Sequence, residues 1–194
     1  MTISTHTGAM MNDSPTIINL GCGFNKLIGA INVDAFEICN PDVVWDLNKF
    51  PYPFENNSVD QIIARHVFEH LDDWWGALGE CARILKNGGR MHIGVPDESS
   101  MSAITYRDHK HIFSLLSFHG IINYTSGSNA WAKTVETALP LKMIEYRRVP
   151  FKEYEWMIKW CPWLLSFCAK HLRNFIWEQR FEFQKQIPIG GKNE

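Results

Sequence analysis

The sequence has neither a long apolar run nor a marked excess of charge of one sign. Its longest uncharged stretch near the C-terminus, Trp160–Ala169, contains ten residues and includes Pro162, whereas a transmembrane helix needs about 20 apolar residues. The formal net charge is −2, so no general attraction to nucleic acid is expected and none is predicted as a partner. The first ten residues lack the basic and apolar regions of a secretory signal. These absences predict a cytoplasmic protein that at most attaches peripherally to a membrane.

Paired cysteine motifs are missing as well. The chain has five cysteines, which is an odd number, and no two of them stand in Cys-x-x-Cys spacing. This pattern favours free thiols in a reducing compartment over a disulfide scaffold. The cysteines are Cys22, Cys39, Cys81, Cys161 and Cys168.

Two nucleotide-binding motifs are absent, and this narrows what the segment 17–34 can bind. The segment runs from an apolar strand through the turn Gly21-Cys22-Gly23 to a second apolar strand that ends on Asp34. Glycines let a backbone pass close to a ligand, and an acid at the carboxyl end of a strand suits ribose hydroxyls. The P-loop signature does not occur, and Lys26 occupies the third glycine position of the dinucleotide pattern. The segment predicts a cofactor with a ribose and no pyrophosphate; the alternative is an ordinary glycine turn.

A second acid stands at the end of another predicted strand. Asp46 follows the apolar run 42–45, as Asp34 follows the run 30–33. Ligands of open α/β sheets bind at the carboxyl ends of the strands, so both acids are candidates for contact with a cofactor. A solvated turn acid or a helix cap is the alternative for each.

Apolar runs alternate with a helical period up to about residue 100. Strands are predicted at 17–20, 30–33, 42–45, 60–64 and 91–95, with a helix at 68–85 and a glycine stop at 86–89. This alternation is typical of an α/β, Rossmann-like and mostly parallel sheet with helices on both faces. Residues 1–14 are small and polar and are expected to be disordered. Residues 15–194 are expected to form a single domain, with a cofactor half up to residue 100 and a substrate half from residue 101.

The second half of the chain is rich in aromatic residues. A short helix is predicted at 115–122, a loop at 126–129, a strand at 139–148 and a closing strand at 180–184, where apolar residues alternate with period two. Apolar residues at helical spacing fill 151–177, where Pro162 must break or restart the helix. Three interpretations of this stripe remain open. It packs on the core, contacts a membrane surface or lipid-linked substrate with the help of its basic residues, or forms a homodimer contact.

An ordered series of short motifs resembles the class I S-adenosylmethionine-dependent methyltransferases, in the branch called methyltransferase type 11. The series covers residues 17 to about 97. Its pieces are Leu20-Gly21-Cys22-Gly23, Asp34, Asp46-Leu47, the segment 54–60, His66-Val67-Phe68-Glu69-His70-Leu71, the segment 80–89 and Val95-Pro96-Asp97. The resemblance implies an enzyme that uses S-adenosyl-L-methionine.

The resemblance also implies which residues hold the cofactor. These are Leu20, Gly21, Cys22, Gly23, Asp34, Asp46, Leu47, His66 and Val67. The glycine turn would pass under the methionine part, and Asp34 would hold the ribose hydroxyls. Residues 46 and 47 would border the adenine, and residues 66 and 67 would lie near the sulfonium and its methyl group.

The sequence departs from the family at two places. The family usually has an acid where this chain has Asn19, and only about seven residues connect Gly23 to Ile31. A crossover between parallel strands normally needs a dozen or more residues, so the first helix of the fold is expected to be missing or reduced to a turn. A subset of the family with this shortening resembles enzymes of surface-polysaccharide biosynthesis. The departures also motivate an alternative, a non-catalytic methyltransferase-like binding protein.

The segment 66–70 matches a second signature, the inverted zinc-protease motif His-x-x-Glu-His. Two histidines at i,i+4 on one helix face could bind zinc. However, His66 directly follows the predicted strand 62–64, which places it before the helix and not inside it. No metal is predicted, and a zinc hydrolase is the less favoured alternative.

A cluster of titratable residues follows the fifth predicted strand. Asp108, His109 and His111 are the candidate catalytic residues, because a histidine can accept a proton from a hydroxyl that is being methylated. Methyl transfer depends mostly on alignment, so a base need not be required, and a solvated loop is the alternative. The resemblance points to a hydroxyl of a sugar or glycan precursor as the acceptor.

Overall fold

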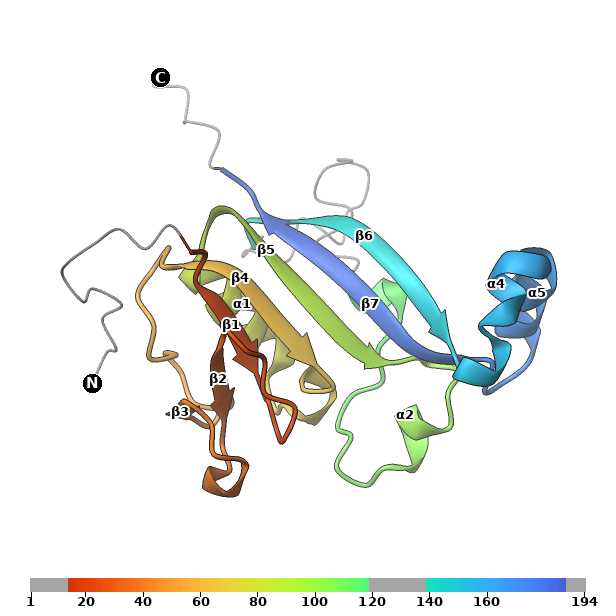
Figure 1. Cartoon of the computed structure of the whole chain (residues 1–194), viewed down its shortest axis with the longest axis horizontal. Coiled ribbons are helices and arrows are strands. Elements are labelled where there is room, and N and C mark those ends of the chain that lie inside the picture. Colours follow the sequence, from red (N-terminus) through yellow and green to blue (C-terminus); the bar gives the residue numbers. More distant parts are fainter. Residues whose placement is uncertain (1–13, 119–138, 188–194) are drawn as a thin grey trace, which may run out of the picture.

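A computed structural model describes residues 14–118 and 139–187, which build one seven-stranded sheet in the order β3-β2-β1-β4-β5-β7-β6 (Figure 1). The strands are β1 (Ile17–Leu20), β2 (Ile31–Asp34), β3 (Val43–Val44), β4 (Val59–Arg65), β5 (Leu85–Pro96), β6 (Leu141–Pro150) and β7 (Ile176–Lys185). The first five pair in parallel, and β7 lies antiparallel between β5 and β6. The predicted Rossmann-like, mostly parallel sheet is confirmed.

The helices of the described residues are few and short. They are α1 (Trp74–Ile84), α2 (Ser102–Thr105), α4 (Trp156–Trp160) and α5 (Pro162–His171), with 3-10 turns η1 (Glu37–Cys39), η2 (Phe68–His70), η3 (Leu115–Phe118) and η6 (Lys152–Tyr154). The predicted helix at 115–122 is described only as far as η3. The predicted loop at 126–129 and nearly all of segment 1–14 lie outside the described residues.

The predicted helix 68–85 is wrong at its start, and the predicted glycine stop at 86–89 is wrong as well, although the helix ends within one residue of the predicted position. It begins only at Trp74, because the carboxylate of Asp73 caps it by accepting a hydrogen bond from the Gly76 N–H at 2.8 Å. It ends without a glycine stop, since Leu85 is already extended with ψ 138°. Residues 86–89 instead belong to β5 and bulge from its ladder, which passes from the pair Val59–Leu85 to the pair Gln61–Arg90.

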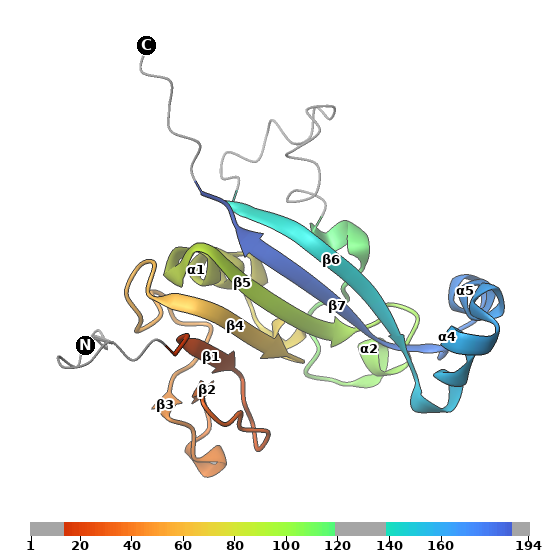
Figure 2. The ribbon, with the colours of Figure 1, turned by 45° about the horizontal axis from the view of Figure 1, so that its top comes forward.

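The hydrophobic core lies on one face of the sheet. Alternate residues of β4, β5 and β7 point to this face and meet the buried side of α1. Phe113 and Phe118 complete the core, with the ring of Phe118 centred 4.5 Å from that of Phe181. Figures 1 and 2 show α1 behind the sheet, with no described helix in front of it.

The opposite face of β4, β5, β6 and β7 carries charged side chains. Arg90 forms an ion pair with Glu182 at 2.8 Å, and Arg180 forms one with Glu178 at 3.0 Å. Because successive side chains of a strand point to opposite faces, these residues alternate with the core residues of the same strands. Within the described residues, helices cover only the core face (Figures 1 and 2), so the helices predicted on the other face are absent from this part of the chain.

The aromatic segment forms a helical hairpin beyond the end of the sheet (Figure 1). Pro162 occupies the first turn of α5, where its missing N–H costs nothing, so the predicted restart is confirmed. The stripe does not pack on the core, because Trp160 is 73% exposed and Trp163 is 72% exposed. Trp177, at the end of the predicted helical segment, lies in β7.

Candidate functional site

The connection from β1 to β2 contains no helix, as predicted, and buried amides hold it in place. Asn32 is 3% exposed, and its backbone N–H and its side-chain amide donate to the Asp42 carboxylate at 2.7 and 2.8 Å. Its Oδ1 accepts hydrogen bonds from the Leu27 N–H at 2.8 Å and from the Asn19 amide at 3.0 Å. Asn19 also donates to the carbonyl of Asn25. The departure at Asn19 therefore has a structural role, because its amide fixes the loop that replaces the helix.

The two motif glycines need their conformational freedom for different reasons. Gly21 has φ +59°, and a Cβ there would lie 2.3 Å from Cγ2 of Val67. Gly23 has φ +48°, and a Cβ there would meet nothing within 4 Å. The first glycine permits close packing of the strand ends, and the second borders open space that a ligand can occupy.

A cavity of about 820 Å³ opens at the carboxyl ends of β1, β2, β3 and β4. We call it the strand-end cavity. It is lined by Gly21, Gly23, Asp34, Ala35, Phe36, Cys39, Trp45, Asp46, Leu47, Asn48, Lys49, His66, Val67, His70, Leu71, Asp108 and Lys110. Its volume is in the range of sites for small molecules and cofactors.

Seven of the nine residues expected to hold a cofactor line this cavity; the other two, Leu20 and Cys22, do not. Leu20 is part of the core. Cys22 is 4% exposed, and burial raises the pKa of its thiol, with Asp34 adding to the effect. Both side chains are buried in the protein and do not line the cavity.

The two predicted acids differ in how far they are fixed. Asp34 is 8% exposed, and its two carboxylate oxygens accept hydrogen bonds from the N–H groups of Gly23 at 2.8 Å and Phe36 at 3.0 Å. A carboxylate offers about four acceptor positions, so each oxygen can still accept a ribose hydroxyl. Asp46 accepts from the Asn48 N–H at 3.0 Å and lies 3.8 Å from the Lys49 ammonium. Asp34 is thus the more rigid of the two.

His66 occupies a strained position directly after β4. Its φ of +54° is uncommon for a residue with a side chain, and such outliers concentrate at functional sites. Burial opposes protonation, but the hydrogen bond to Glu69 at 3.2 Å and the charges of Glu69 and Glu178 outweigh it, so the pKa of His66 is raised. The helix face that a zinc-hydrolase motif needs is absent here, because η2 begins only at Phe68.

The three candidate catalytic residues lie in one loop, but only Asp108 lines the strand-end cavity. Nε2 of His111 is 2.9 Å from the carbonyl of Leu71, so one of its ring nitrogens already has a partner. His109 turns its Nδ1 into the protein, where this atom is buried. Lys110, between the two histidines, lines the cavity and pairs with Asp72 at 2.7 Å.

Sequence reasoning missed other residues of the cavity lining. Phe36 and Trp45 stand within two positions of the predicted acids, so the strand-end rule could have found them. His70 and Lys110 come together only because the N–H groups of Lys110 and His111 donate to the carbonyl of Glu69 at 2.7 and 3.2 Å. No local signal predicts this contact between distant segments.

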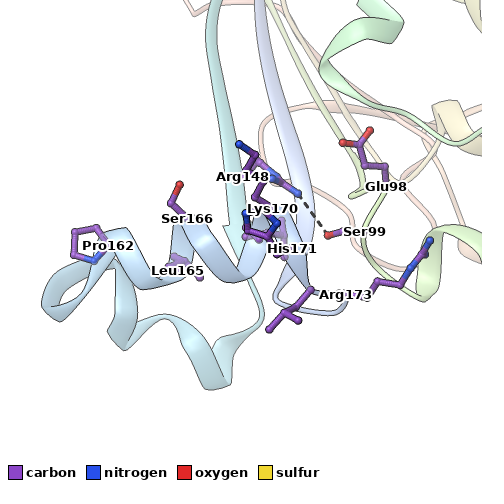
Figure 3. A pocket seen from close by; sticks show the side chains of 12 residues that line it. Glu98, Ser99, Arg148, Pro162, Leu165, Ser166, Lys170, His171 and Arg173 are labelled. Atoms are coloured by element: carbon purple, nitrogen blue, oxygen red, sulfur yellow. Dashed lines mark hydrogen bonds between the residues drawn. The ribbon is translucent and has the colours of Figure 1, made fainter.

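A second cavity, of about 760 Å³, lies between α5 and the segment after β5 (Figure 3). We call it the basic cavity. It is lined by Glu98, Ser99, Arg148, Pro162, Leu165, Ser166, Ala169, Lys170, His171, Leu172, Arg173 and Ile176. Arg148 is anchored by two hydrogen bonds to the buried Asp97, at 2.7 and 2.8 Å. Among the described residues, Lys170 and Arg173 have no acidic partner within 4.0 Å, which leaves positive charge in the lining.

Comparison with known proteins finds a family for one segment of the chain. Residues 33–93 match the family model of a methyltransferase domain. A relative, an uncharacterized 37.1 kDa protein in transposon Tn4556 of Streptomyces fradiae, is 39% identical over 56 residues. The matched segment is 29% of this chain and 16% of that protein.

Solved structures show the same fold over most of the chain. A SAM-dependent methyltransferase from Archaeoglobus fulgidus matches with a TM-score of 0.61 at 14% identity, over 88% of this chain and 86% of that one. The [4+2]-cyclase SpnF matches with a TM-score of 0.56 at 10% identity, over 90% of this chain and 75% of that one. None of the helices in the described part of the chain has the length and apolar character that crossing a membrane requires.

Proposed function

We propose that the chain binds S-adenosyl-L-methionine in the strand-end cavity and methylates a hydroxyl of a sugar or glycan precursor, because residues 33–93 match the model of a methyltransferase domain and the chain shares the fold of a solved SAM-dependent methyltransferase. The observation that carries this proposal is the convergence of Gly21, Gly23, Asp34 and His66 on one cavity from three different strand ends. These residues come from separate motifs of the sequence.

The residues of the cavity have separable tasks in this proposal. Asp34 is held by two backbone N–H groups, so it can receive the ribose hydroxyls without rearranging. Gly23 leaves space for the methionine part of the cofactor, while Asp46 and Leu47 border the adenine. The bound cofactor supplies an electrophilic methyl group on its sulfonium. The protein's task is then to align the acceptor oxygen with that methyl group and to exclude water.

The basic cavity supports an acceptor that carries negative charge. Lys170 and Arg173 add positive charge to its lining, where Glu98 is the only acid among the described lining residues. Charge-assisted contacts to phosphate are among the stronger polar interactions. A nucleotide sugar or another phosphorylated glycan precursor has both the hydroxyl and the charge that this arrangement suits.

Binding of the cofactor tests the first half of the proposal. Asp34→Ala should weaken the affinity for S-adenosylmethionine at least tenfold in isothermal titration calorimetry, because a pair of charge-assisted hydrogen bonds is lost. Glu55→Ala removes an exposed acid outside the cavity lining and serves as the control. Equal affinities of the two variants would contradict the ribose assignment.

Product formation tests the second half. We expect S-adenosylhomocysteine to appear with at least one member of a panel of nucleotide sugars and glycans. Tight cofactor binding without product from any acceptor would favour the non-catalytic alternative. The assay is needed because the [4+2]-cyclase SpnF shares the fold, so the fold alone does not specify methyl transfer.

The α4–α5 hairpin has the chemistry of a membrane-surface contact, and we assign it to an anionic lipid surface. Trp160, Trp163 and Phe167 are exposed on it. The sequence from Trp156 to Trp177 contains three Lys or Arg residues and no Asp or Glu. Aromatic residues beside basic ones suit the boundary between headgroups and acyl chains. This contact would bring the basic cavity, which α5 borders, close to a lipid-linked acceptor; a homodimer is the competing occupant.

A further inference from the structure

We propose that Glu69, His70 and His109 bind a divalent transition-metal ion beside the strand-end cavity. One possible ligand atom of each residue lies within 4.8 Å of those of the other two. Glu69 and His70 are consecutive in η2, and His109 comes from the loop after α2. The cluster differs from the pair His66 and His70 that the zinc-hydrolase motif would use, and the sequence alone predicted no metal.

Two buried atoms without partners point to a ligand at this place. Glu69 is 1% exposed, and its Oε2 has no hydrogen-bond partner. Nδ1 of His109 is also buried and unpartnered, and these two are the only such side-chain atoms in the described part of the chain. A buried polar atom without a partner costs about 1–3 kcal/mol, and more when it is charged. A metal ion coordinated by Oε2 of Glu69 and Nδ1 of His109 would give both atoms a partner.

The surrounding residues orient the cluster as the outer partners of metal ligands do. Nδ1 of His70 is 3.2 Å from both the carboxylate and the carbonyl oxygen of Asp108, which leaves the other ring nitrogen to coordinate. Oε1 of Glu69 contacts Nδ1 of His66 at 3.2 Å. Histidines that bind metals usually donate their second nitrogen to a carboxylate or a carbonyl group, and this contact fixes the ring.

The donor set selects the class of metal. Two imidazole nitrogens and one carboxylate oxygen are the ligands of catalytic zinc sites and of non-haem iron(II) sites, whereas magnesium and calcium prefer oxygen alone. Ligand atoms in such a site lie about 3.3 Å apart, from metal–nitrogen bonds of about 2.0 Å and tetrahedral angles. Ligand atoms that lie up to 4.8 Å apart must therefore draw closer when the metal binds. Three protein ligands leave a coordination position open.

The open coordination position of the metal ion could bind the hydroxyl of the methyl acceptor. This role of the site rests on the proposed function. His70 and Asp108 line the strand-end cavity, so a metal ion held by His70 borders the same space as the cofactor. A metal-bound hydroxyl has a lowered pKa. The acceptor would lose its proton to water, and its oxygen would then bond to the methyl carbon as the carbon–sulfur bond breaks, with the electron pair left on sulfur.

Metal binding is tested on the untagged full-length protein after treatment with a chelator. Titration with zinc should show one equivalent bound with micromolar or tighter affinity and should raise the melting temperature, because the ion binds only the folded state. His109→Ala and Glu69→Gln should each weaken zinc binding at least tenfold, whereas His92→Ala, on the charged face of the sheet, should leave it unchanged. Cobalt should give visible absorption bands in the wild type that are lost in His109→Ala.

Each outcome decides the proposal. Absence of stoichiometric zinc, or equal binding by the wild type and His109→Ala, overturns it. Two ligand variants, Glu69→Gln and His109→Ala, are made so that one still gives a result if the other does not fold. Zinc binding by a protein that does not bind S-adenosylmethionine would uphold the metal site and refute the proposed function. The reverse result would refute the metal site alone.

Discussion

At the scale of single residues, the two motif glycines should contribute to different properties: Gly21 to the stability of the fold and Gly23 to the affinity for the cofactor. Gly21→Ala should destabilise the protein by about 2–4 kcal/mol, because its Cβ would overlap Val67 at a positive φ. Gly23→Ala should cost only about 1 kcal/mol of strain, since nothing lies within 4 Å of its Cβ, but it should lose cofactor affinity. Denaturant unfolding and titration calorimetry measure the two effects. Equal losses of stability in both variants would contradict this division.

The limits of sequence-based prediction also show at single residues. The strand-end rule pointed to Asp34 and Asp46, which both line the strand-end cavity, because the position of an acid after an apolar run is local information. Histidine chemistry singled out the loop of His109 and His111. It could not tell that His111 contacts the carbonyl of Leu71 or that His109 faces Glu69, since both contacts join segments about 40 residues apart.

At the scale of elements, the connection from β1 to β2 depends on one amide. Asn32→Ala should destabilise the protein by about 2–4 kcal/mol, because it removes a side chain that takes part in five hydrogen bonds and leaves buried partners unpaired. It should also weaken cofactor binding, since the same loop carries Gly23. Asn25→Ala, in the exposed part of this loop, is the control and should change little. If Asn32→Ala unfolds at the same denaturant concentration as Asn25→Ala, the side-chain amide of Asn32 does not stabilise the loop.

Helix α1 is tied to the segment before β4 by the ion pair of Arg83 and Glu80, and the stability that this pair contributes depends on pH. Arg83 joins Glu80 to the carbonyls of Tyr52 and Phe54. Burial raises the pKa of Glu80, but its hydrogen bonds from Arg83 and from the Tyr52 N–H outweigh burial, so this pKa is lowered overall. A lowered carboxyl pKa stabilises the fold above the pKa of the unfolded chain, and this effect is lost as the pH falls through the folded value.

Glu80→Gln should therefore lower the free energy of unfolding at pH 7 by about 1–3 kcal/mol. The difference from the wild type should shrink as the pH falls toward 3, because acid protonates Glu80 in the wild type too. Urea unfolding at a series of pH values measures it. A difference that stays constant from pH 7 to pH 3 would argue against the ionised pair.

The sequence predicted which strands and helices exist better than it predicted the residues at which they begin and end. Apolar runs located the strands because a buried parallel strand needs continuous apolar residues. The start of α1 was misplaced because the periodicity continues through η2, whereas the helix that Asp73 caps begins six residues later than the pattern suggested. The bulge at 86–89 was taken for a helix stop, because two glycines in sequence suit either role.

At the scale of the whole molecule, the exposed hairpin should decide where the protein resides. The protein should sediment with vesicles that contain phosphatidylglycerol, and high salt should weaken this binding because the basic residues contribute to it. The double substitution Trp160→Ser and Trp163→Ser should abolish it. Ile28→Ser removes an exposed apolar side chain outside the hairpin and should have no effect. Failure of the wild type to bind vesicles, with a dimer that the double variant disrupts, would assign the hairpin to self-association.

The short connection between β1 and β2 has a consequence for how the chain folds. The paired residues Asn19 and Asn32 are 13 positions apart, whereas a crossover unit with a helix spans about 30 residues or more. Loop-closure entropy grows with the logarithm of loop length, so this pairing costs about 0.7 kcal/mol less. Contacts that are close in sequence form early. The turn that borders the strand-end cavity is therefore expected to take shape before β6 and β7 join the sheet, so that this part of the cavity belongs to the folding nucleus.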